Sequence, residues 1–147
     1  MRKKRPTLRS VNGSRRSPGA SSTLPARIDG CLFANELLDA MPAHRVVQTA
    51  DGLGEWYVDV TRDGRLALVV GELSTPALVA YFAACGVTIP EGVSVEVSLD
   101  ARAWVASAAG ALVRGSLLLV DYGDRVQGLL ARRHGTLMAF RDHRVAN

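Results

Sequence analysis

Apolar residues in this chain fall into short runs that polar and glycine-rich segments separate, a pattern typical of strands that alternate with helices. The first run covers residues 30–34 (GCLFA) and is long enough for a buried strand. It ends at Asn35 and Glu36. Residues 37–41 then predict a helical turn that Pro42 stops, because proline cannot continue a helix.

The next segment predicts an antiparallel arrangement of three strands. Residues 44–49 (HRVVQT) and 55–61 (EWYVDVT) are rich in β-branched and aromatic residues, and they flank the turn sequence DGLG. We expect these two runs to form a hairpin. Residues 65–70 (RLALVV), which follow the turn sequence RDG, predict the third strand.

A helix and a strand are predicted after this hairpin. The sequence STP at residues 74–76 indicates a helix start, since a hydroxyl cap precedes a proline in the first turn. This helix should run to about Cys85 and end at Gly86. Residues 93–99 (VSVEVSL) alternate strictly between apolar and polar, which predicts a strand. The apolar residues that share one face of it are Val93, Val95, Val97 and Leu99.

A longer helix and another strand follow directly. Asp100 is suited to cap a helix over residues 101–113, and Arg114 with Gly115 should end it, because a cation and a glycine favour a helix C-terminus. Residues 116–120 (SLLLV) form a continuous apolar run, as expected of a strand that is buried on both faces of a parallel sheet.

The last part of the chain predicts a polar connection over residues 125–134 and a final strand-like segment over residues 135–145. Buried strands that are followed by helices indicate an α/β fold with a largely parallel sheet. The run of three strands between residues 44 and 70 predicts an antiparallel insertion in that sheet.

The positive charge of the chain is concentrated in residues 1–22, which contain seven cations and no acid. The whole chain has 18 Lys and Arg against 14 Asp and Glu, so residues 23–147 hold 11 cations and 14 acids and have a net charge of −3. The composition of residues 1–22 predicts a disordered basic tail ahead of one domain, residues 23–147. The tail is open to three interpretations: a nucleic-acid arm, a transit-like leader, or an extension with no selected role. Nucleic-acid binding is the weakest functional hypothesis.

Two further patterns concern the compartment of the protein. Cys31 and Cys85 lie beside apolar residues, which predicts two buried reduced thiols rather than a disulfide framework, and no metal-ligand spacing is present. The apolar stretch of residues 103–120 is interrupted by charged, hydroxyl and glycine residues, and it favours a helix and a strand over a membrane span. We therefore expect a soluble, cytoplasmic protein.

Two strand ends carry the polar residues that are the first candidates for chemistry. Asn35 and Glu36 follow one apolar run, and Asp121 and Tyr122 follow another. In open α/β sheets, ligands bind beyond the carboxyl ends of the strands. An Asn-Glu pair directly after a buried strand favours a ligand contact more than a turn, and Tyr122 is ambiguous because it sits at the same edge.

Other candidates have a structural alternative. Asp39 and Asp100 are typical of helix caps or turns. His44 or His143 could act as a general base because histidine titrates near neutral pH, although a single histidine on a strand is more often structural or solvated. The aromatic residues that favour packing over cofactor binding are Trp56, Tyr57 and Trp104.

Taken in order, five sequence blocks resemble the MidA family of S-adenosylmethionine-dependent methyltransferases. The blocks are GCLFANELLDAMPAHRVV, EWYV, VSVEVSLDARAWV, RGSLLLVDYG and GTLMAFRDHRV. The resemblance covers about residues 24–145 and is most specific in the first and the last two blocks. It implies a seven-stranded Rossmann-like fold and a partial class I methyltransferase domain. Mitochondrial members of this family are complex I assembly factors that methylate a protein arginine.

The resemblance also implies roles for individual residues. It places Asn35, Glu36 and Asp39 beside the methyl donor and the substrate. We assign Glu36 and Asp39 as catalytic. Glu36 is the first candidate for the substrate, since a carboxylate can hold a guanidinium through two parallel hydrogen bonds. We assign Asn35 as cofactor-binding. The residues assigned to substrate binding are Asp121, Tyr122 and His143.

One part of the family pattern is missing. No strand followed by a Gly-x-Gly turn precedes Asn35, and the spacing of Gly13, Gly19 and Gly30 does not fit such a turn. The family's first three strands are absent, and the family continues beyond Asn147, so we expect a fragment that lacks the glycine-rich cofactor loop. Two hypotheses follow: a methyltransferase that a complementing chain or second copy completes, or a non-catalytic interaction module.

Overall fold

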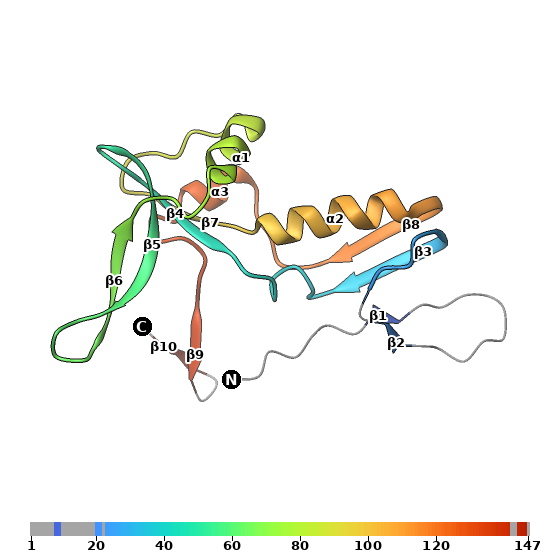
Figure 1. The fold of residues 1–147 in the computed structure, drawn as a ribbon, viewed down its shortest axis with the longest axis horizontal. Helices are drawn as coiled ribbons and strands as arrows, with labels where there is room; N and C mark the ends of the chain where they lie inside the picture. Colours follow the sequence, from blue (N-terminus) through green and yellow to red (C-terminus); the bar gives the residue numbers. More distant parts are fainter. Residues whose placement is uncertain (1–7, 10–19, 22, 142–143, 147) are drawn as a thin grey trace. The chain divides into compact units, whose positions relative to one another are not determined.

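The computed structural model describes residues 8–9, 20–21, 23–141 and 144–146 of the chain (Figure 1). The chain divides into two compact units: unit 1 is Met1–Pro42 with Asp100–Tyr122, and unit 2 is Ala43–Leu99 with Gly123–Asn147. Most of the basic tail lies outside the described residues, so its predicted disorder stays a prediction. The prediction of one domain over residues 23–147 also stays a prediction.

Unit 1 is built on two parallel strands and one helix. β3 (Ile28–Asn35) pairs with β8 (Leu112–Val120), and α2 (Leu99–Ala111) leads directly into β8. Figure 1 shows α2 alongside this strand pair. β1 (Leu8–Arg9) and β2 (Ala20–Ser21) form a further short antiparallel pair. The parallel pairing after a helix confirms the predicted α/β class.

The core of unit 1 uses small and apolar side chains from both the sheet and the helix. Leu32 and Ala34 of β3 are buried, as are Ala108 and Ala111 of α2. Between the two buried positions of β3, Phe33 points the other way and is 57% exposed. This alternation is the ordinary two-residue period of a strand that is covered on one face.

The boundary between α2 and β8 differs from the prediction. The helix ends at Ala111 instead of Val113, and Arg114 and Gly115 belong to the strand. Local signals favoured a helix end at Arg114, but pairing with β3 overrides them: Arg114 is opposite Asp29 and Gly115 is opposite Gly30. The backbone can pair here because Gly115 has a φ of 131°, and a Cβ at this position would collide with the Gly30 carbonyl oxygen.

Two other expectations for unit 1 are wrong. Strand β8 is not buried on both faces, since Leu118 and Val120 are about half exposed (51% and 48%). Its pairing partner among the described residues is β3, and the two strands leave one apolar face uncovered by these residues. Residues 37–41 form turns rather than a helical segment, with a hydrogen bond from the Met41 amide to the Leu38 carbonyl (3.1 Å).

Unit 2 contains an antiparallel sheet with the order β6-β5-β4-β7. Its strands are β4 (His44–Thr49), β5 (Gly52–Val60), β6 (Leu66–Gly71) and β7 (Ser94–Val97). The predicted hairpin and the third strand are confirmed. The predicted strand over residues 93–99 is confirmed in its centre, where Val93, Val95 and Val97 are all buried.

Helix α1 (Ala77–Cys85) covers part of this sheet. The predicted hydroxyl residue at the N-cap is wrong, because Pro76 occupies that position and forms no side-chain cap hydrogen bond. The predicted end is confirmed: Gly86 has a φ of 62° and donates its amide to the last turn. Leu78 and Phe82 of the helix are buried. The hydrophobic core of unit 2 consists of Val46, Leu78, Phe82, Ile89, Val93, Val95 and Val97.

The C-terminal part of unit 2 contains elements that the sequence pattern did not predict. A short helix, α3 (Val126–Leu130), lies within the segment expected to be a polar connection. The expected final strand is instead two short strands, β9 (Ala139–Arg141) and β10 (Arg144–Ala146), which pair antiparallel. No helix in the described part of the chain is long and apolar enough to cross a membrane.

Candidate active site

The carboxyl ends of β3 and β8 lie side by side in unit 1. The parallel register places Asn35 opposite Val120, so the residues that follow them, Glu36 and Asp121, leave the sheet at the same edge. The Glu36 amide donates a hydrogen bond to the Val120 carbonyl (2.8 Å), which extends the pairing by one residue. The two polar segments that the sequence singles out therefore lie at one edge of this strand pair.

Glu36 has an unusual backbone conformation at this edge. Its φ is 47°, and no other non-glycine residue in the described part of the chain has a positive φ. A side chain in this region costs energy, and such residues are concentrated at active sites and ligand-binding turns. The conformation turns the chain sharply after β3, and the next residue, Leu37, is buried and anchors the turn.

The Asp121 carboxylate joins the two strand ends. Its Oδ2 accepts hydrogen bonds from the amides of Leu38 (2.8 Å) and Asp39 (3.4 Å), and its Oδ1 accepts one from the Tyr122 amide (2.8 Å). The turn after β3 is thus held by a side chain from β8's end. The bonds from Leu38 and Asp39 connect residues that are 83 and 82 positions apart in the sequence.

The side chains that remain available at this edge are polar and exposed. Asn35, Glu36 and Asp39 are all exposed, and Tyr122 is 82% exposed. Within the described part of the chain, the carboxylates of Glu36 and Asp39 make no ion pair. This edge therefore presents two negative charges that a cationic group could approach from solvent.

The structure thus brings five of the six predicted site residues onto two adjoining segments of unit 1. These residues are Asn35, Glu36, Asp39, Asp121 and Tyr122. His143 lies outside the described residues, so its predicted role stays a prediction. The exposed amide and carboxylates lie at the edge of a sheet that contains two strands among the described residues.

A second polar cluster, in unit 2, surrounds the buried carboxylate of Glu55. Its Oε1 is 2.8 Å from His44 Nδ1, and its Oε2 accepts hydrogen bonds from the Ser74 amide (2.8 Å) and the Tyr57 hydroxyl (3.3 Å). Burial alone would raise the pKa of Glu55, but the hydrogen bonds from Ser74 and His44 outweigh it and lower this pKa below its ordinary value. Burial and the adjacent Glu55 carboxylate raise the pKa of Tyr57.

This second cluster does not form a catalytic relay. The Ser74 hydroxyl and the Glu55 carboxylate both approach the same nitrogen of His44, at 3.2 and 2.8 Å. A nucleophile–histidine–acid relay needs its two partners on opposite ring nitrogens. Sequence reasoning did not single out Glu55; the available signal was an acid at the head of the otherwise β-rich run EWYV.

A third polar cluster holds the segment that contains the GTL sequence. The Glu96 Oε2 accepts hydrogen bonds from the Thr136 amide (2.7 Å) and hydroxyl (2.9 Å). Arg45, which is opposite Glu96 across the β4–β7 pair, stacks over the Trp56 ring at 5.7 Å and donates to the His134 carbonyl (2.7 Å). Trp56 therefore has the packing role that the sequence favours.

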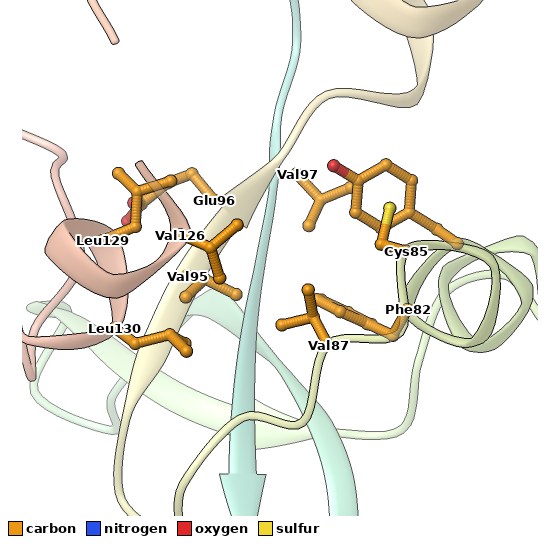
Figure 2. Close-up of a pocket in the computed structure, with 10 residues that line it drawn as sticks. Phe82, Cys85, Val87, Val95, Glu96, Val97, Val126, Leu129 and Leu130 are labelled. Atoms are coloured by element: carbon orange, nitrogen blue, oxygen red, sulfur yellow. The ribbon is translucent and has the colours of Figure 1, made fainter. Parts of the chain in front are cut away.

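The cavity shown in Figure 2 lies between α1, β7 and α3 and has a volume of about 100 Å³. Its walls are mainly apolar, with Phe82 and Cys85 from α1, Val95 and Val97 from β7, and Leu130 from α3.

Cys31 and Cys85 are both exposed free thiols, so their expected burial is wrong. The strand pairing of β3 leaves Cys31 on an outward position, and α1 ends at Cys85 beside this cavity.

The polar edge and the cavity are built from different parts of the chain. None of the residues that line the cavity belongs to the set Asn35, Glu36, Asp39, Asp121 and Tyr122. Among the described residues, no cluster of three or more His, Cys, Asp or Glu side chains could hold a metal ion. The polar edge of unit 1 is therefore the candidate active site.

A strand-end site of this kind, on an α/β unit, agrees with the comparisons with known proteins. The family model described as "Putative S-adenosyl-L-methionine-dependent methyltransferase" matches residues 18–147. The chain therefore belongs to this family of methyltransferases. A comparison with curated proteins finds no match.

Two solved structures from Burkholderia thailandensis are similar to the chain. One, an uncharacterised protein, has 30% sequence identity and a TM-score of 0.74 over 86% of this chain and 34% of its own. The other is described as a likely methyl transferase bound to S-adenosyl-homocysteine, and it has 31% identity and a TM-score of 0.70 over 84% of this chain and 32% of its own. The chain thus spans about a third of the length of each neighbour, and it has the α/β fold of part of these proteins.

Proposed function

We propose that this chain contributes the substrate-facing edge of an S-adenosylmethionine-dependent methyltransferase. The observation that supports it most directly is the meeting of Asn35 and Glu36 with Asp121 at the carboxyl ends of two parallel strands. Membership in the methyltransferase family supports methyl transfer as the reaction. The neighbour bound to S-adenosyl-homocysteine supports S-adenosylmethionine as the methyl donor. Asn35, exposed at the end of β3, is the residue that we assign to the donor.

We further propose that the substrate is an arginine side chain of a protein, as the MidA resemblance implies. The exposed carboxylate of Glu36 can bind a guanidinium through two parallel hydrogen bonds, and Asp39 adds a second negative charge on the same turn. Binding in this manner fixes the orientation of the nitrogen that is methylated. S-adenosylmethionine, when bound, supplies the methyl group. We assign Tyr122, which is exposed next to Asp121, and His143 to substrate binding.

We propose that polypeptide outside these 147 residues completes the site, since the chain spans about a third of each solved neighbour. The two strands of unit 1 provide one wall of a donor site. Donor binding by this chain alone should therefore be weak but saturable. A complementing chain or a second copy would supply the glycine-rich loop that the sequence pattern lacks.

Calorimetric titration with S-adenosylmethionine tests the donor assignment. We expect saturable binding that Asn35→Ala weakens about tenfold and that Glu36→Gln leaves unchanged, because Glu36 is assigned to the substrate. Transfer of a labelled methyl group to an arginine-containing protein should fall about a hundredfold in Glu36→Gln, since the charged partner of a guanidinium is lost. Asp29→Ala, an exposed site at the opposite end of β3, is the matched control.

The alternative is a non-catalytic interaction module, and one observation favours it. The β5–β6 hairpin exposes large apolar side chains, with Val58, Leu66 and Leu68 at 66%, 76% and 55% exposure. Exposed apolar groups of this size often mark a binding surface. A well-folded chain that shows no saturable donor binding would support this alternative over the methyltransferase.

A further inference from the structure

The Asp121 carboxylate receives three backbone amides and has little capacity left for a ligand. Its Oδ2 bonds to Leu38 and Asp39, and its Oδ1 bonds to Tyr122. The bond from the Leu38 amide is 2.8 Å long and part-buried. Hydrogen bonds from amides to an ionised carboxylate are stronger than those between neutral groups.

These bonds hold a turn whose conformation is otherwise unfavourable. Glu36 has a φ of 47°, a region that costs a glutamate energy unless surrounding contacts maintain it. Two contacts maintain it: the Glu36 amide donates a hydrogen bond to the Val120 carbonyl, and the Asp121 carboxylate accepts hydrogen bonds from the amides that follow. Both originate from the end of β8, so this strand fixes the direction of the turn that follows β3.

We infer that Asp121 is a positioning residue, which acts on the substrate through Glu36 and Asp39 and does not bind the substrate itself. Asp121 ties the turn to β8, and the turn then holds the two exposed carboxylates at the strand edge. This inference rests on the proposed function for its catalytic meaning. The part of the inference that concerns structure, namely that Asp121 controls the turn, depends only on the hydrogen bonds.

Two substitutions at Asp121 separate positioning from direct binding. Asp121→Ala removes every acceptor. Asp121→Asn keeps a carbonyl oxygen that can face the Leu38 amide, but it loses the charge and the second acceptor that a bound guanidinium needs. Positioning therefore predicts rescue by asparagine, whereas direct binding predicts that both variants fail alike.

Amide hydrogen exchange of the full chain, followed by NMR, measures the turn without any ligand. We expect the protection of the Leu38 amide to fall about tenfold or more in Asp121→Ala and to stay within about threefold of wild type in Asp121→Asn. Asp29→Ala, which removes an exposed partner of Arg114 in the same unit, should leave Leu38 unchanged. Unchanged protection of Leu38 in Asp121→Ala would overturn the inference.

Steady-state methyl transfer adds the catalytic part of the test. We expect Asp121→Ala to lower kcat about tenfold, and Asp121→Asn to restore it to within about threefold. An equal rise in KM for the arginine substrate in both variants would show direct binding and would contradict the positioning role. If the wild-type chain transfers no methyl group even when the polypeptide that completes the site is supplied, the proposed function fails, while the exchange result still decides whether Asp121 controls the turn.

Discussion

At the scale of single residues, Glu55 shows how one buried acid fixes the local structure of unit 2. Its carboxylate connects His44 on β4, Tyr57 on β5 and the Ser74 amide just before α1. The side chain is nearly inaccessible to solvent, so its charge depends on these partners. Glu55 therefore fixes the entry of α1 against the β4–β5 hairpin.

Glu55→Gln should destabilise the chain at neutral pH by about 1–3 kcal/mol, because a buried charged acceptor is replaced by a neutral one. The pKa of Glu55 is lowered in the folded state, so its contribution is present above the ordinary carboxyl pKa. The contribution is lost as the pH falls through the lowered pKa. Urea unfolding of both proteins between pH 7 and pH 3 should show the difference shrinking with acidification; a difference that grows would contradict this account.

Residue identity alone identified some site residues and missed others. Asn35, Glu36 and Asp121 were predictable because polar residues directly after apolar runs stand out in the sequence. Glu55 was not, because its burial depends on Ser74 and His44, which local sequence does not connect to it. The backbone role of Asp121 was also hidden, since the amides that it binds are 82 and 83 residues away.

At the scale of elements, local patterns predicted the antiparallel part of the fold better than the parallel part. The β4–β5–β6 strands follow one another with short turns, so alternation and turn residues suffice to define them. The start of β8 depends on pairing with β3, which is distant in sequence. The helix α3 and the β9–β10 pair lie in polar sequence whose pattern gives no clear period.

Two glycines on either side of the α2–β8 junction should respond oppositely to alanine. Gly110 lies in α2 with open space around its Cβ position, so Gly110→Ala should stabilise unit 1 by about 0.5–1 kcal/mol. Gly115 has a φ of 131° and its Cβ would meet the Gly30 backbone, so Gly115→Ala should destabilise by about 2 kcal/mol or more.

Thermal or urea unfolding of the two variants beside wild type measures both effects. Changes of opposite sign in the free energy of unfolding would confirm that Gly110 lies in α2, and that Gly115 lies in β8 and pairs closely with Gly30 of β3. A neutral Gly115→Ala would show that this close approach of the two backbones does not occur.

At the scale of the whole molecule, two compact units divide the polar chemistry between them. Unit 1 carries the exposed strand edge with Glu36 and Asp39, and unit 2 carries an apolar cavity and two structural polar clusters. The family and the solved neighbours connect this chain with methyl transfer, and the chain spans about a third of the length of each neighbour. We therefore expect that the edge of unit 1, and not the cavity of unit 2, contacts the donor and the substrate.

Titration of the isotopically labelled chain with S-adenosyl-homocysteine, followed by NMR, distinguishes the edge from the cavity, because chemical shifts detect even weak binding and assign it to residues. Our expectation is that saturable shifts are confined to residues 35–39 and 121–122, and that Asn35→Ala weakens them and Asp29→Ala leaves them intact. Shifts that instead map to the cavity around Val95 and Leu130, or no shifts from a well-folded chain, would contradict it.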